Sequence, residues 1–165
     1  MTSLKLKKIR NEEVQQCVKI LLESEPWITL GWTKKGATKA MKDGIRVGEV
    51  LVAVKGKEVA GFIVFLPKWG FPLGGYVRLL AVNEKCRGMG IGKILLKKAE
   101  ERIFRNWPNV FLLVSSFNTS AQGFYRRLGY EKIGEIADAT VRGHSEFIMR
   151  KTRGPVRRYK PERKR

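Results

Sequence analysis

The spacing of apolar residues predicts two helices in the first third of the chain. A short strand-like start over 4–9 is followed by apolar side chains at intervals of three and four residues, which indicate a helix. Asn11 is the expected N-cap of this helix, which should close before Pro26. The connection 26–32 contains two tryptophans and has no clean period. A second helix is expected to end near Gly44, because glycine favours helix ends.

The middle of the chain has the composition of β-strands. Residues 49–54 and 58–66 are rich in β-branched side chains and flank the turn 55–57, so they predict an antiparallel hairpin. Residues 67–74 are expected to form a loop, and the apolar run 76–82 a third strand.

The second half of the chain alternates between helical and strand-like segments. An apolar stripe predicts a helix from about Gly90 to Arg105, which ends ahead of Pro108. The later elements are expected in the order strand, helix, strand and strand, over 110–115, 119–128, 130–136 and 146–150. This order predicts a mixed α/β sheet with one parallel crossover at its centre.

Length and composition fit one folded domain. The 165 residues are 43% hydrophobic, so the 30% charged content describes a solvated surface. No run approaches about 18 uncharged apolar residues and the N-terminus lacks a cleavable apolar segment, so we expect a cytoplasmic protein without membrane association. Cys17, Cys86 and His144 are the whole set of cysteines and histidines, which disfavours disulfide scaffolds and metal sites. No metal cofactor is expected.

The charge balance is strongly basic, with 34 Lys and Arg against 15 Asp and Glu, a net charge of +19. From Arg150 to Arg165 there are nine basic residues and one acid, which contribute +8 and leave +11 for the rest. This balance favours anionic ligands such as phosphates, nucleotides or nucleic acid.

The C-terminal residues 151–165 have a composition distinct from the domain expected over 1–150. Two prolines and dense like charge oppose helix and sheet, so we expect a flexible tail. One interpretation is an electrostatic tether to RNA, the ribosome or another polyanion, with Tyr159 able to stack on a base. The other is a solubilising tail that touches nothing.

One glycine-rich segment carries a specific chemical signal. It lies between the strand ending at Val82 and the following helix, and it reads Arg87, Gly88, Met89, Gly90, Ile91, Gly92 and Lys93. Glycines allow close backbone approach, and a helix N-terminus offers unpaired N–H groups, so the segment is expected to bind a phosphate or diphosphate. A Walker A loop is excluded because Arg87 and Ile94 stand where it needs glycine and Ser or Thr. A dinucleotide fingerprint is excluded because Lys93 occupies the position of its third glycine.

The remaining pattern, with Arg87, Gly90 and Gly92 at its fixed positions, resembles the GNAT superfamily of acetyl-CoA-dependent N-acetyltransferases. A second segment, Asn118 to Tyr130, is similar to that family's Asn, Ala, Phe-Tyr and Leu-Gly-Tyr pattern. The resemblance covers roughly residues 4–150. It implies a mixed, mostly antiparallel central sheet flanked by helices, with a splayed parallel strand pair.

The resemblance also implies roles for individual residues. Backbone amides of Arg87 to Lys93 would bind the coenzyme A pyrophosphate, and Asn118 would contact the cofactor. The pantetheine arm would pair like an added strand with the backbone of Leu80, Ala81 and Val82. The amide near Val82 would polarise the thioester carbonyl, and Tyr125 would protonate the departing thiolate. The alternative for Tyr125 is a packing role.

The general base is the point at which the sequence departs from some family members. These use a glutamate on the strand that corresponds to 76–82, and 76–80 contains no carboxylate. Glu146 is the leading substitute, acting directly or through water, and its alternative is a surface strand residue. Cys86 lacks an accompanying histidine, so a nucleophilic role is disfavoured.

The expected activity is transfer of an acetyl group from acetyl-CoA to a primary amine by direct attack in a ternary complex. The acceptor is unidentified: a protein N-terminus, a protein lysine or a small amine. The alternative function is a nucleic-acid-binding or regulatory module that retains the fold without efficient catalysis. A monomer or a homodimer is expected.

Overall fold

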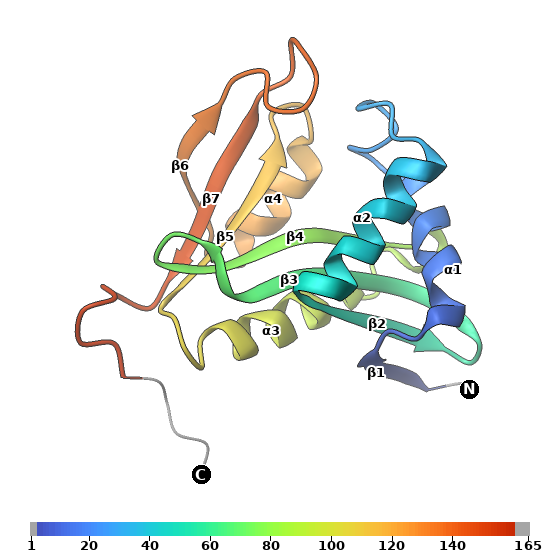
Figure 1. The fold of residues 1–165 in the computed structure, drawn as a ribbon, viewed down its shortest axis with the longest axis horizontal. Coiled ribbons are helices and arrows are strands. Elements are labelled where there is room, and N and C mark those ends of the chain that lie inside the picture. The colour runs from blue at the N-terminus through green and yellow to red at the C-terminus, as the bar shows by residue number, and fades with distance from the viewer. Residues whose placement is uncertain (1–2, 161–165) are drawn as a thin grey trace. The chain divides into compact units, whose positions relative to one another are not determined.

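The computed structural model describes residues 3–160, which form two compact units (Figure 1). The first unit comprises the residues up to Phe65 together with Arg78–Ala99, and the second comprises Leu66–Val77 together with the residues from Glu100 onward. Strands β3 (Glu58–Phe71) and β4 (Gly74–Val82) each contribute to both units. No helix among the described residues is long and apolar enough to span a membrane.

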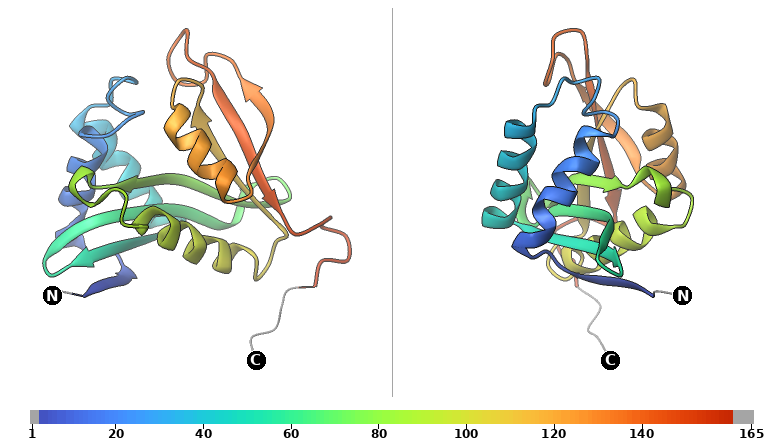
Figure 2. Two further views of the ribbon diagram at one scale, coloured as in Figure 1. Left: turned by 180° about the vertical axis from the view of Figure 1, so that it is seen from behind. Right: turned by 90° about the vertical axis from the view of Figure 1, so that its right-hand side faces the viewer.

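The first unit is built on strands in the order β1, β2, β3 and β4. Strand β1 (Leu4–Lys8) pairs antiparallel with β2 (Glu49–Lys55), and β2 pairs antiparallel with β3. Helices α1 (Asn11–Leu22) and α2 (Lys34–Val47) share a buried hydrophobic core with these strands. They cover one face, and α3 (Ile91–Ile103) begins on the other (Figure 2). The short 3₁₀ helix Glu84–Cys86 separates β4 from the glycine-rich segment.

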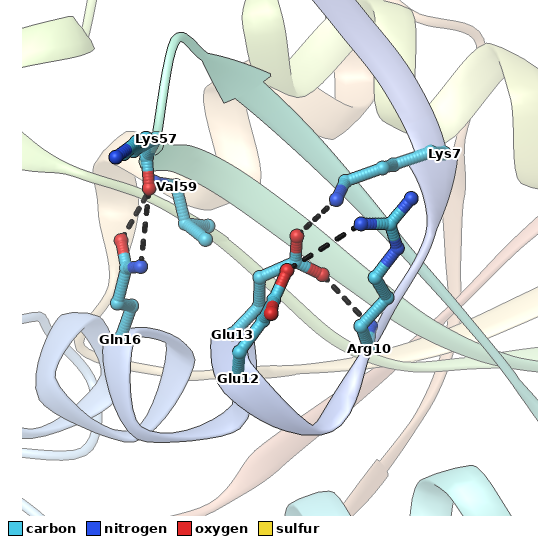
Figure 3. A network of polar contacts seen from close by, with 7 residues as sticks. All are labelled: Lys7, Arg10, Glu12, Glu13, Gln16, Lys57 and Val59. Carbon is cyan, nitrogen blue, oxygen red and sulfur yellow. Dashed lines mark hydrogen bonds and ion pairs between the residues drawn. The ribbon is translucent and has the colours of Figure 1, made fainter.

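A polar network holds α1 against the strands (Figure 3). Glu13 is 4% exposed, and its carboxylate forms an ion pair with Lys7 and accepts a 2.7 Å hydrogen bond from the backbone N–H of Arg10. Burial raises the pKa of Glu13, but the Lys7 and Arg10 contacts outweigh it and lower the pKa below its usual value. The Gln16 amide donates to the Lys57 carbonyl and accepts from the Val59 N–H, which ties α1 to the β2–β3 turn.

Two helix boundaries differ from the sequence-based prediction. Arg10, not Asn11, is the N-cap of α1, because the Glu13 side chain binds the Arg10 amide. Gly44 does not end α2, which continues to Val47. A Cβ on Gly44 would lie 2.5 Å from Cγ1 of Val64, so this glycine lets helix and sheet approach closely.

The prediction of a loop over residues 67–74 is wrong. Strand β3 continues to Phe71 and β4 begins at Gly74, so a tight turn with a positive φ at Leu73 joins the strands. Phe71 stacks on Phe111 with ring centroids 4.3 Å apart, and this contact stabilises the long strand.

The second unit has the strand order β4, β5, β7 and β6. It contains β5 (Asn109–Ser115), α4 (Thr119–Arg127), β6 (Glu131–Ile136) and β7 (Glu146–Thr152). The β4–β5 pair is parallel, whereas β5–β7 and β6–β7 are antiparallel. The expected fold class, a mostly antiparallel mixed sheet with a parallel pair, is confirmed.

Strand β7 continues two residues beyond the domain boundary expected after residue 150. Its ladder with β5 includes the pairs Val110↔Lys151 and Asn109↔Thr152. Residues 161–165 of the expected flexible tail lie outside the described residues, so the mobility of that part stays a prediction.

Candidate functional site

The glycine-rich segment adopts a conformation that requires glycine at two positions. Gly88 and Gly90 both have φ of +76°, in the left-handed region that other residues rarely adopt. A Cβ built on either would meet no atom within 4 Å. Glycine is therefore required at these positions by the backbone conformation and not by crowding from neighbouring atoms. The space beside each backbone is open to a ligand.

Several backbone amides of this segment have no hydrogen-bond acceptor within α3, because they lie before or in its first turn. The Ile94 amide donates to the Gly90 carbonyl over 3.1 Å, as the helix requires. The amides of Ile91, Gly92 and Lys93 belong to the first turn, which has no intrahelical acceptor. The Arg87 amide is used elsewhere, since it donates to the Glu84 carbonyl. Donors for an anion therefore come from Gly88 to Lys93, at the positive end of the helix dipole.

The Arg87 side chain anchors this segment inside the first unit. Its Nη2 donates to the hydroxyl of Ser24 over 3.1 Å, and its Nε lies 3.4 Å from the Val82 carbonyl oxygen. Ser24 is buried and directly follows the C-cap of α1. The guanidinium thus fixes the loop to the end of β4 and to the end of α1.

The last residues of β4 lie beyond its parallel ladder with β5. That ladder ends at the pair Val77↔Leu112, and Leu80, Ala81 and Val82 follow it. On β3, a Cβ at Gly61 would lie 2.9 Å from the Ala81 carbonyl oxygen, so a glycine there allows close approach of the two strands.

Tyr125 lies on α4 and is buried between aromatic rings. Its ring is 5.2 Å from that of Phe124 and 5.7 Å from that of Tyr130, both in edge-to-face geometry. Burial, with a smaller effect from Tyr76, raises the pKa of Tyr125 well above its ordinary value. The phenol therefore keeps its proton at neutral pH and remains a donor.

Asn118 has a local structural role as the N-cap of α4. Its side-chain oxygen accepts a 3.2 Å hydrogen bond from the Ala121 amide. Its expected contact with a cofactor stays a prediction.

Glu146 is a buried carboxylate at the start of β7, where it pairs with Ser115 on β5. Only 7% of it is exposed, so the alternative of a surface strand residue is wrong. Its Oε1 accepts a 2.5 Å hydrogen bond from the Ser115 hydroxyl. Burial raises the pKa of Glu146, and the Ser115 bond offsets part of that rise. A carboxylate of raised pKa is a stronger base when ionised.

Two polar groups of the second unit were missed at the sequence level. The Gln122 amide donates to the carbonyls of Ser115 and Ser116 over 3.1 and 2.9 Å, which ties α4 to the end of β5. Glu100 is buried, accepts from the Tyr130 hydroxyl over 2.9 Å and pairs with Lys151 over 2.8 Å. The burial of Glu100 could have been predicted from its sequence position, because it is four residues after Leu96 and three before Ile103, on the apolar stripe of α3.

The remaining reactive side chains have structural surroundings. Burial raises the pKa of the Cys17 thiol to about 12, so it stays protonated. His144 packs edge-on against Phe117, with ring centroids 5.0 Å apart. Within residues 3–160, no group of three or more His, Cys, Asp and Glu side chains could hold a metal ion.

Comparisons with known proteins agree with this fold. A family model described as "Acetyltransferase (GNAT) family" matches residues 7–130. An uncharacterised N-acetyltransferase of Methanocaldococcus jannaschii is 40% identical over 74 residues, 44% of this chain and 46% of that protein. An N-alpha-acetyltransferase of Sulfurisphaera tokodaii is 30% identical over 104 residues, 56% of this chain and 62% of that protein. The matched regions thus span about half of these relatives.

Solved structures match over more of their length. The crystal structure of PH1933 from Pyrococcus horikoshii has a TM-score of 0.80 at 19% identity, covering 92% of this chain and 99% of that one. An aminoglycoside 6'-N-acetyltransferase complexed with coenzyme A has a TM-score of 0.71 at 18% identity, with 92% and 98% coverage. At these identities the similarity is one of fold.

Proposed function

Because this chain belongs to the GNAT acetyltransferase family, we propose that it transfers an acetyl group from acetyl-CoA to a primary amine. The observation that carries the proposal is the exposed Gly88–Gly90 backbone, which leads directly into the unpaired amides of α3. That geometry suits a diphosphate better than a carboxylate, because several donors and a helix dipole act together.

The cofactor proposal assigns the pyrophosphate to the amides from Gly88 to Lys93, with the Lys93 ammonium adding charge. Arg87 then has a positioning role through its bonds to Ser24 and Val82. The pantetheine arm is assigned to the backbone of Leu80 to Val82, where β4 has passed its ladder with β5. A structural neighbour complexed with coenzyme A supports this choice of co-substrate.

The proposed reaction needs no acyl-enzyme intermediate. The acceptor nitrogen attacks the thioester carbonyl, forming a C–N bond, and collapse of the tetrahedral intermediate breaks the C–S bond. The amide near Val82 stabilises the oxyanion, and Tyr125 supplies the proton that leaves with the thiol. Glu146 accepts the proton lost by the amine, directly or through water.

For the acceptor, we place a protein or peptide N-terminus ahead of a lysine side chain or a small amine. The support is a relative named as an N-alpha-acetyltransferase. The net charge of +19 disfavours polyamines and lysine-rich peptides and favours neutral or acidic ones. We further propose a cytoplasmic location, because acetyl-CoA and nascent proteins meet in that compartment. The oligomeric state that we propose is a monomer or a homodimer.

The alternative, a binding or regulatory module without efficient catalysis, is less well supported. The family match favours a catalytic protein. Tyr125 keeps its proton at neutral pH, as a donor must, although its raised pKa makes it a weaker acid than an ordinary tyrosine. Basic surface is also compatible with a catalytic protein, so the charge does not favour the alternative.

The test is release of free thiol from acetyl-CoA with a panel of amines: peptides with free or blocked N-termini, internal lysines and small amines. Matched reactions with propionyl-CoA and succinyl-CoA determine acyl specificity. We expect thiol release that depends on a free N-terminus and is fastest with acetyl-CoA. Binding of acetyl-CoA without release over the whole panel would favour the regulatory alternative, and absence of binding would overturn both assignments.

A further inference from the structure

The first part of the C-terminal basic segment folds back onto the second unit. The Arg153 amide donates to the Pro108 carbonyl over 2.8 Å, and the Arg153 guanidinium lies 4.2 Å from the centre of the Phe104 ring. The Tyr159 hydroxyl donates a 2.6 Å hydrogen bond to the Phe104 carbonyl, just beyond α3. Both ends of the segment 153–160 are therefore attached to the body of the unit.

Between these attachments the segment lines a cationic cavity of about 340 Å³ that is partly open to solvent. The residues that line it are Arg153, Pro155, Arg157, Arg158, Tyr159 and Lys160. Of the residues that the structure describes, the lining contains four cations and no acid. No carboxylate within residues 3–160 pairs with Arg157, Arg158 or Lys160. The cavity has roughly ten times the volume of one water molecule in the liquid, which is more than a single phosphate fills.

The turn inside the segment holds an arginine where the backbone favours glycine. The Tyr159 amide donates to the Val156 carbonyl over 3.1 Å, which closes a four-residue turn. Its third residue, Arg158, has φ of +78°, the value that makes glycine the preferred residue at that position of a type II turn. A cation is thus kept at a conformational cost, and such strain points to a function that requires it.

We propose that the segment Arg153–Lys160 is a preformed binding site for the phosphodiester backbone of single-stranded nucleic acid. Three cations without a carboxylate partner among residues 3–160 line one cavity, and their combined charge suits consecutive phosphates, whereas a free phosphate would use only part of the space. The Tyr159 hydroxyl is engaged by Phe104, so the ring serves as an anchor for the site. This differs from the base-stacking role expected from the sequence, and it is independent of acetyl transfer.

The test is fluorescence anisotropy of a labelled, mixed-sequence single-stranded RNA with the full chain at several salt concentrations. The variant is the triple substitution Arg157→Gln, Arg158→Gly and Lys160→Gln, in which the glycine keeps the turn. The control is Lys5→Gln, Lys8→Gln and Lys57→Gln, an equal charge change on exposed residues of the first unit. Circular dichroism and thermal unfolding verify that both proteins are folded.

We expect the variant to lower the slope of log affinity against log salt by about 2, because each lost phosphate contact removes about 0.7 for a single strand. The control should retain the wild-type slope. Equal losses in both proteins would overturn the site, since they would indicate a general charge effect. Displacement of RNA by inorganic phosphate as effectively as by an oligonucleotide of equal phosphate content would also overturn it, because one phosphate would then fill the site.

Tyr159→Phe separates the anchor from base stacking. The substitution keeps the ring and removes only the hydroxyl that binds Phe104. We expect RNA affinity to fall about fivefold, because the substitution removes one ordinary hydrogen bond that keeps the site ordered. Unchanged affinity would contradict the anchoring that the site requires.

Discussion

Replacing Gly90 with glutamate probes the diphosphate assignment in the glycine-rich segment. Gly90 has φ of +76° and open space around its Cβ position, so the protein itself presents no steric obstacle to a side chain. The conformational cost of a non-glycine residue there is about 1 to 3 kcal/mol. Gly31→Glu is a matched control, since Gly31 has φ of +67°, is equally unobstructed and belongs to the same unit.

The two variants should therefore lose similar stability but differ in acetyl-CoA binding. At Gly90 the new carboxylate costs about 1 to 4 kcal/mol of repulsion at about 4 Å from a phosphate charge. Loss of one charge-assisted amide contact adds about 2 kcal/mol. A total near 4 kcal/mol corresponds to roughly a thousandfold weaker binding.

Isothermal titration calorimetry with acetyl-CoA measures this difference, and thermal unfolding measures the shared loss of stability. We expect Gly31→Glu to bind as the wild type does. If Gly90→Glu also keeps wild-type affinity while its melting temperature falls with that of the control, the segment does not hold the diphosphate and the cofactor assignment is wrong.

Three further predictions concern buried groups of the second unit. Tyr125→Phe should lower turnover by about 10²-fold with little change in acetyl-CoA affinity, because only the acid is removed; unchanged turnover in steady-state assays would make Tyr125 structural. Burial raises the pKa of Glu146 in the folded protein above the 4.5 of the unfolded chain. The wild type should therefore lose stability as pH rises above 4.5, because ionisation of Glu146 is harder in the folded state. Glu146→Gln lacks this titration, so its stability relative to the wild type should increase as pH rises above 4.5. Thermal unfolding at stepped pH measures this, and a constant difference between the two proteins would contradict it. Glu100→Gln should lower the free energy of unfolding by about 2 to 3 kcal/mol in urea titrations. The control is Glu23→Gln, which removes an exposed ion pair with Lys19 and should cost less than about 1 kcal/mol. Equal losses of stability in the two variants would show that the buried contacts of Glu100 contribute no more than a surface ion pair.

The sequence pattern predicts the elements well where local signals and packing agree. Helix α4 was expected at 119–128 and spans Thr119–Arg127, because an Asn cap and a following glycine fix both ends. At Gly44 the two disagree, since the residue most typical of a helix end is there for contact with Val64. The prediction of a loop over 67–74 was wrong for a related reason. The proline and glycines that suggested a loop belong to long strands, which aromatic stacking stabilises.

The candidate site was predictable where backbone conformation depends on residue type. Positive φ at Gly88 and Gly90 follows from the glycines themselves. The environment of Glu146 was not predictable, because its burial depends on pairing with Ser115, 31 residues away in the sequence. The attachment of Tyr159 to Phe104 is likewise a contact between distant residues, which composition alone does not reveal.

Acetyl transfer to an amine is tested by mass spectrometry of a peptide acceptor after incubation with acetyl-CoA and the purified protein. We predict one acetyl group on the peptide's α-amine for each coenzyme A thiol released, no acetyl group retained on the protein, and strongly reduced product with Gly90→Glu. Thiol release without any acetylated amine would contradict acetyl transfer to an amine. Product formation that Gly90→Glu leaves unchanged would contradict the assignment of the diphosphate to the glycine-rich segment.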